Sequence, residues 1–253
     1  MKRILTWLLI ALMLMLTSSC TTTEGNNMNQ TWTQNQLNVL GSTLITQERI
    51  DDGRLLPSEV RLMNIVAKVE DYLAQRYPGE TFVIHGLKDV LFQSDRLSMH
   101  ISDSTGASFH MVTNTAKEDL SDLAITDGYY PLVKDAQAKE YVLDLLEDAG
   151  MTGGKTTAWL YGSFDAAYDP ALSMTESIAQ GLGYGVFGNV FLPKTGNENI
   201  TAAALTAALC GKGLTGSLSV WVMDVLPQGE PAAAWVKEYC KPQGVCAIHI
   251  DLE

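Results

Sequence analysis

The sequence predicts an α+β protein, in which a helix plus an antiparallel meander is followed by an α/β sandwich-like half with helices packed on a mixed sheet. Three observations predict this class. An amphipathic helix pattern precedes three short strand patterns, strand and helix patterns alternate after residue 150, and 46% of the 253 residues are hydrophobic. This content is enough for one large domain or two smaller ones. We expect residues 57–150 to form the first half and residues 151–253 the second.

The first half is predicted from helical spacing and turn chemistry. Ser58 is expected to cap a helix whose apolar residues recur at every third or fourth position as far as Tyr77, before Pro78 and Gly79 end it. Strands are expected at residues 81–85, 96–102 and 107–113, and the turn residues 103–106 predict a hairpin of the last two. A second helix is expected at residues 135–148.

The second half is predicted from alternating patterns. Strands are expected at residues 156–164, 185–192, 217–226 and 245–252, with helices at residues 200–210 and 231–239. The alternation favours helices packed on a mixed sheet, but it leaves open whether the two halves share one sheet. Residues 20–56 precede both halves; they begin with a polar tether, and residues 37–50 form either a strand or a wrapped loop.

The first twenty residues predict where in the cell the protein is located. Lys2 and Arg3 form a basic start, residues 4–16 form an apolar run too short to span a bilayer, and small residues lead to Cys20. This segment resembles the signal peptide of a bacterial lipoprotein. The resemblance implies removal of residues 1–19, lipidation of Cys20 and anchoring on the outer face of the cell membrane or in an outer membrane. The helix-and-meander plan resembles uncharacterised surface lipoproteins of Gram-positive bacteria.

Charge excludes some partners. The net charge is −12, and removal of residues 1–19 would make it −14. Nucleic-acid binding needs clustered Lys and Arg, which the sequence lacks, so no nucleic-acid partner is expected. The membrane is expected as a partner only through the lipid on Cys20.

Three cysteines follow Cys20. Cys240 and Cys246 flank a turn that contains Pro and Gly, and an oxidising compartment would permit a disulfide between them. Two free thiols are an equally good expectation, because the sequence spacing does not fix the distance between the two Cα atoms. Cys210 has no partner in either case, and the cysteine spacing does not match a zinc site.

Two glycine-containing motifs match nucleotide-binding patterns, but the helices and strands predicted around them do not fit such sites. Residues 149–156 fit a relaxed P-loop pattern with Lys155 and Thr156 in the active places, but a predicted helix precedes them and a strand follows, the reverse of a P-loop. Residues 183–188 spell G-x-G-x-x-G, yet a strand follows instead of a helix. We therefore expect a helix cap and a loop, and no nucleotide or other cofactor.

Two groups of titratable residues are candidate sites. Matching apolar faces across the predicted hairpin place His100 opposite His110, and such a pair could share a metal or respond to pH. His249 and Asp251 point to one side of the last strand, and Asp224 lies near the end of another, so a catalytic acid-base cluster is conceivable if these strands are neighbours. Solvent-facing or strand-end roles are the alternative for both groups.

Two functions remain. The favoured one is a non-enzymatic, lipid-anchored domain that binds a protein partner, a peptide or a small solute in the cell envelope. The alternative is an extracytoplasmic hydrolase with a carboxylate and histidine site. Six aromatic residues are expected in the core or covering the sheet, with a ligand platform as the alternative: Trp159, Trp221, Trp235, Tyr129, Tyr130 and Tyr184.

Overall fold

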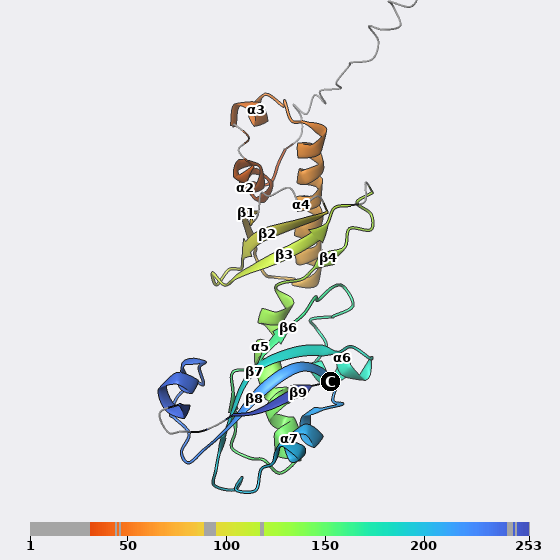
Figure 1. Cartoon of the computed structure of the whole chain (residues 1–253). Coiled ribbons are helices and arrows are strands. Elements are labelled where there is room, and N and C mark those ends of the chain that lie inside the picture. Colours follow the sequence, from red (N-terminus) through yellow and green to blue (C-terminus); the bar gives the residue numbers. More distant parts are fainter. Residues whose placement is uncertain are drawn as a thin grey trace, which may run out of the picture.

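The computed structural model of the chain describes residues 31–253, except 44, 46, 89–94, 117–118, 242–244, 246 and 253. These residues form two lobes, each built on its own sheet (Figure 1). The first lobe holds β1–β4 with α2–α4, and the second holds β5–β9 with α5–α7. The predicted α+β class is confirmed, and the two halves do not share one sheet.

The N-terminal part of the described chain is helical, which corrects the prediction for residues 37–50. Helix α2 (Gln34–Ser42) begins at a capping box, because the Thr33 side chain accepts from the Gln36 backbone N–H while the Gln36 side chain accepts from that of Thr33. Val39 and Leu40 are completely buried in the first core. A short helix, α3 (Gln47–Asp51), follows. Residues 34–42 and 47–51 therefore belong to the folded lobe, whereas residues 20–30, which make up most of the predicted tether, lie outside the described residues.

Helix α4 (Pro57–Arg76) is the predicted long helix of the first lobe. Its N-cap is Leu56 and not the expected Ser58, because Pro57 suits the first turn and the Glu59 carboxylate accepts the Leu56 backbone N–H at 2.6 Å. Its apolar stripe supplies the first core with Met63, Ile65, Val66, Val69 and Leu73.

The first sheet has the order β1-β2-β3-β4 and is antiparallel throughout. Its strands are β1 (Val83–Leu87), β2 (Arg96–Ser102), β3 (Ser108–Asn114) and the unpredicted β4 (Ile125–Thr126). The hairpin and its register are confirmed, since His100 pairs with His110. Met99, Ile101, Phe109 and Met111 face α2 and α4, and no helix of the described chain covers the opposite face of this sheet.

Helix α5 (Tyr130–Asp148) belongs to the second lobe, although the sequence predicts a helix at residues 135–148 as part of the first half. Ala138, Val142 and Leu146 are buried in the second core. The border between the cores falls between two adjacent residues, since Tyr129 packs in the first core and Tyr130 in the second. The border therefore lies before α5 and not at residue 150.

The second sheet is mixed, as predicted, with the order β5-β7-β8-β9 and with β6 also paired to β7. The strands are β5 (Lys155–Thr156), β6 (Trp159–Tyr161), β7 (Tyr184–Pro193), β8 (Leu214–Met223) and β9 (Ala247–Leu252). The parallel pair β7–β8 is connected through α7 (Ala202–Leu209). Helix α6 (Met174–Ala179) was not predicted, and α5 crosses one face of the sheet together with α6 and α7 (Figure 1).

The opposite face of the second sheet is covered only at one end. Phe191 and Met223 pack there against Trp235 and Cys240, which belong to the segment around η1 (Val236–Cys240). This short π-helix replaces the regular helix predicted for residues 231–239. The remainder of this face carries no helix of the described chain, and we call it the open face.

Candidate functional site

The predicted lipidation site, Cys20, lies outside the described residues. Among those that are described, no helix is long and apolar enough to cross a membrane. Cys246 also lies outside the described residues, so its disulfide with Cys240 stays a prediction. Cys240 itself is buried, with its sulfur 3.8 Å from that of Met223.

The P-loop-like motif is a helix cap followed by a strand, as its context predicts. Gly150 ends α5 with a left-handed φ of 82°, and its N–H donates to the Glu147 carbonyl. Lys155 lies in β5, where its ammonium donates to the carbonyls of Pro227 and Gly229 and lies 5.4 Å from the centre of the Trp235 ring. The lysine therefore ties the segment around Trp235 to the sheet.

Three large aromatic side chains gather on the open face. Trp159 and Tyr161 project from β6 with 48% and 65% of their surface exposed, and Phe187 projects from β7. The Trp159 and Phe187 rings are stacked with centroids 6.4 Å apart, while Tyr161 and Phe187 meet edge to face at 5.3 Å. Trp159 therefore lies over the sheet, one of the two places that the sequence predicts, but about half of its surface stays exposed, whereas Trp235, Tyr129, Tyr130 and Tyr184 are buried. Exposed, clustered aromatic rings are typical of binding surfaces.

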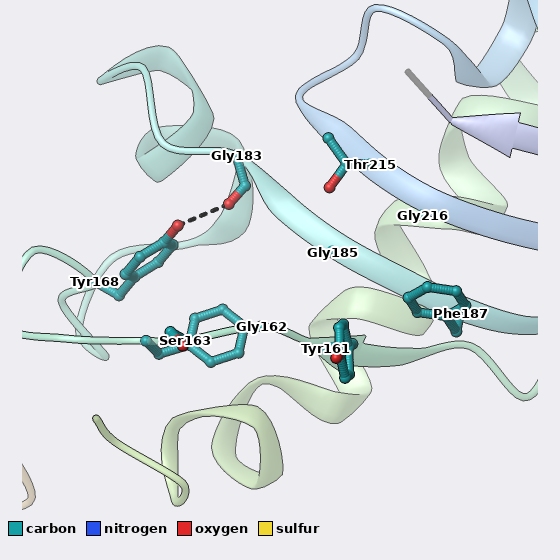
Figure 2. Close-up of a pocket in the computed structure, with 10 residues that line it drawn as sticks. Tyr161, Gly162, Ser163, Tyr168, Gly183, Gly185, Phe187, Thr215 and Gly216 are labelled. Carbon is teal, nitrogen blue, oxygen red and sulfur yellow. Dashed lines mark hydrogen bonds between the residues drawn. The ribbon is translucent and has the colours of Figure 1, made fainter. Parts of the chain in front are cut away.

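A pocket of about 360 Å³ adjoins these rings (Figure 2). Its lining consists of four glycines, four aromatic residues and two hydroxyl residues: Gly162, Gly183, Gly185, Gly216, Tyr161, Phe164, Tyr168, Phe187, Ser163 and Thr215. None of these side chains carries a charge. The Tyr168 hydroxyl donates to the Gly183 carbonyl at 2.9 Å, which holds the 162–168 loop against β7. The volume lies within the range of small-ligand pockets.

Polar side chains continue the open face across β8 and β9. The pairing of β7, β8 and β9 places Asn189, Ser219 and His249 in one row. Ser219 Oγ lies 3.0 Å from His249 Nδ1, and Asn189 Oδ1 accepts from the Trp221 indole N–H at 2.9 Å. The open face therefore combines apolar rings at β6 and β7 with hydroxyl, amide and imidazole groups farther on.

The predicted acid-base cluster is only partly assembled. His249 and Asp251 share the open face, but Asp224 lies beyond the end of β8, where its carboxylate is 3.4 Å from the Lys194 ammonium. Strand β8 spans Leu214–Met223 and not the predicted residues 217–226, so Asp224 falls just past its end. No acidic side chain among the described residues hydrogen-bonds to His249, so its partner is Ser219 instead of a carboxylate.

The other histidine pair lies on the open side of the first sheet. The centroids of the His100 and His110 rings are 5.4 Å apart, and His85 on β1 adds a third ring 5.0 Å from His100. His85 Nε2 also lies 2.8 Å from Ser102 Oγ. The rings stand side by side along the row, and the described residues hold no group of three His, Cys, Asp or Glu side chains arranged to bind a metal. The metal role of His100 and His110 stays a prediction.

A buried carboxylate connects the two lobes, and sequence reasoning missed it. The Asp127 side chain is fully buried, and its Oδ2 accepts the Tyr77 hydroxyl at 2.6 Å and the Tyr72 hydroxyl at 3.1 Å. Arg76 Nε lies 3.0 Å from the same oxygen. These three partners all come from the end of α4. Asp127 directly follows β4, so it fixes the end of α4 against that strand.

The same residues reach into the second lobe. Asp127 Oδ1 accepts the backbone N–H groups of Tyr129 and Tyr130 at the start of α5, at 2.9 and 3.0 Å. The Arg76 guanidinium donates to the Asp165 carbonyl at 3.0 Å. A negative group at the first turn of a helix is stabilising. Asp127 and Arg76 together therefore hold the two lobes in their relative position.

The buried tyrosines at this junction predict alkaline unfolding. Burial raises the pKa of Tyr72, Tyr77 and Tyr130, and it raises that of Tyr129 to about 12. Because their folded-state pKa is raised, the unfolded chain loses these protons first, near pH 10. Stability is therefore present below about pH 10 and is lost as the pH rises above it. Circular dichroism and tyrosinate absorbance should change together in an alkaline titration; tyrosinate forming fully while the dichroism stays native would contradict this.

No protein-family model matches the chain, and none of the curated proteins compared with it is similar in sequence. A solved structure of a DUF5037 family protein from Ruminococcus gnavus matches 68% of this chain and 86% of its own, at 13% identity and a TM-score of 0.29. At this identity and TM-score, the likeness does not establish a shared function.

Proposed function

We propose that this protein is a lipid-anchored binding module of the cell envelope, facing outside the cytoplasm, whose ligand docks on the open face. The observation that supports it most is the exposure of Trp159 and Tyr161 on either side of the half-buried Phe187, beside an uncharged pocket. Burying such rings yields much of the binding energy of many interfaces, because they bring a large apolar area at a low cost in conformational entropy.

The hydrolase alternative has one observation in its favour, the hydrogen bond between Ser219 and His249. A serine nucleophile of this kind also needs an acid that orients the imidazole and donors that stabilise an oxyanion. Of the two predicted acids, Asp224 pairs with Lys194, and Asp251, on the same face as His249, forms no hydrogen bond with that imidazole in the described chain. The geometry therefore favours binding over hydrolysis at this face.

The membrane anchor rests on the resemblance of residues 1–20 to a lipoprotein signal. Metabolic labelling of cells with a palmitate analogue is expected to mark the wild-type chain and to fail with Cys20→Ala, because the thiol carries the acyl groups. Cys210→Ala, which changes a cysteine within the folded second lobe, is the matched control and should label normally. Equal labelling of wild type and Cys20→Ala would refute the anchor.

The binding face can be tested in its natural setting before the ligand is known. Hydroxyl-radical oxidation followed by mass spectrometry measures the exposure of each aromatic side chain. On intact cells, Trp159 and Tyr161 are expected to oxidise at least several-fold more slowly than in the purified protein, because the ligand covers them. Tyr239, which is 38% exposed and lies near the covered end of the sheet, is the matched control and should oxidise equally in both.

The same comparison has a clear negative outcome. If Trp159 and Tyr161 oxidise at equal rates on cells and in the purified protein, the open face is unoccupied in the envelope and the proposed function fails. If Tyr239 is protected to the same extent as Tyr161, the protection is general shielding by the envelope, which also removes the support for a specific face.

A further inference from the structure

The lining of the pocket indicates an uncharged ligand. Charged side chains are absent from the ten residues that form it, and its polar side-chain groups are the hydroxyls of Tyr161, Ser163, Tyr168 and Thr215. A phosphate, sulfate or carboxylate ligand would find no cationic side chain in this lining to offset its loss of hydration. The net charge of −12 also repels polyanions at long range.

The hydroxyl groups distinguish a sugar from an apolar ligand. Within the described chain, the hydroxyls of Tyr161 and Ser163 have no hydrogen-bond partner, so water satisfies them in the free protein. An apolar peptide side chain over this pocket would strip that water and leave the hydroxyls unpaired, at a cost of about 1–3 kcal/mol for each buried group. A sugar hydroxyl both donates and accepts, so it can replace the water.

The aromatic rings of Tyr161 and Phe187 also suit a sugar. Tyr161 is the most exposed of the three rings and meets Phe187 at an interplanar angle of 87°, so the two rings form a corner at the pocket. The negative face of an aromatic ring attracts positively polarised C–H groups. A pyranose has such C–H groups on its faces and hydroxyls around its rim. One such ring can therefore contact an aromatic face while its rim reaches Ser163 and Thr215.

We infer that the open face binds a neutral saccharide chain, with a sugar ring packed against Tyr161 and Phe187 and its hydroxyls bonded to the pocket rim. This inference rests on the proposed binding function and names its ligand class. Trp159, stacked beside Phe187, extends the platform along β6 and gives a neighbouring sugar of the chain a second surface.

The test is calorimetric titration of the full-length protein in a polyoxyethylene detergent, which has no sugar headgroup that would compete. The probes are neutral hexose and N-acetylhexosamine oligosaccharides, uronic-acid oligosaccharides of equal length and an apolar peptide. We expect a neutral oligosaccharide to bind, and Trp159→Ala and Tyr161→Ala each to raise its Kd at least about tenfold. Tyr161→Phe, which keeps the ring, should weaken binding less than Tyr161→Ala. Tyr239→Ala is the matched control and should change Kd less than about twofold.

Several results would overturn the inference. Tighter binding of the uronic-acid chains or of the apolar peptide would show that the ligand is not a neutral saccharide. An unchanged Kd in both Trp159→Ala and Tyr161→Ala would show that the saccharide does not bind at these rings. If none of the neutral saccharides binds while Trp159 and Tyr161 are protected from oxidation on cells, the saccharide inference fails and the proposed binding function stands. If that protection is also absent, both fail.

Discussion

Replacing Asp127 with alanine is expected to lower the free energy of unfolding by about 3–5 kcal/mol, the typical cost of removing one partner from a buried ion pair. The carboxylate is fully buried and has Arg76, two tyrosine hydroxyls and two backbone N–H groups as partners. Without it, the Arg76 guanidinium, only 10% exposed, would stay at the junction without a counter-ion. Urea-induced unfolding of the purified protein measures this loss.

Two variants sharpen the test. Asp127→Asn keeps an acceptor oxygen but loses the charge, so its loss of stability should fall between that of the wild type and that of Asp127→Ala. Asp135→Ala removes an exposed carboxylate whose partner is Lys139, one turn away on α5, and should cost less than about 1 kcal/mol. If Asp127→Ala costs no more than Asp135→Ala, the carboxylate does not hold the lobes together.

The second large effect is expected from Gly185→Ala, which should disrupt the open face. A Cβ atom at this position would lie 2.1 Å from the Tyr161 carbonyl oxygen, far inside contact distance. Because that oxygen belongs to the backbone of β6, relief requires β6 to move away from β7. We expect a loss of about 1–3 kcal/mol in the free energy of unfolding, as in other overpacked sites. Ligand affinity should also fall, because Tyr161 moves with its strand.

Gly183→Ala is the matched control for this prediction. Gly183 lines the same pocket, but a Cβ there would meet only the Gly213 carbonyl oxygen at 3.8 Å, an ordinary contact. Its effect on unfolding should stay within about 0.5 kcal/mol. Equal effects of the two substitutions on stability and affinity would mean that the close approach of β6 to β7 does not shape the site.

The sequence predicted the elements whose signals are local and repeated. The β2–β3 hairpin was placed in its correct register because apolar residues alternate on both strands around an obvious turn. Helix α2 was missed although its capping box is visible as Thr33 and Gln36, and α6 was missed although Ser173 and Glu176 form the same pattern. Neither helix has the long apolar periodicity on which the prediction relied.

The candidate site was harder to predict because it depends on contacts distant in sequence. Alternation shows that Trp159 and Leu160 face opposite ways, but it does not show which face the helices cover. The partners of Asp127 on α4 lie 50 or more positions earlier, so no local pattern reveals that network. A shift of a few residues in the bounds of β8 moved Asp224 past the strand end, and this separated it from His249.

The measurement that tests the central claim most directly is an amide chemical-shift map of the isotope-labelled protein, titrated with the oligosaccharide that binds it or with solubilised envelope material. The account predicts that shifts concentrate on β6, β7 and β8, around Tyr161, Phe187 and Thr215, and that β1–β3 stay unchanged. Shifts centred on the other open sheet face, around His85, His100 and His110, with none at β6, would contradict it.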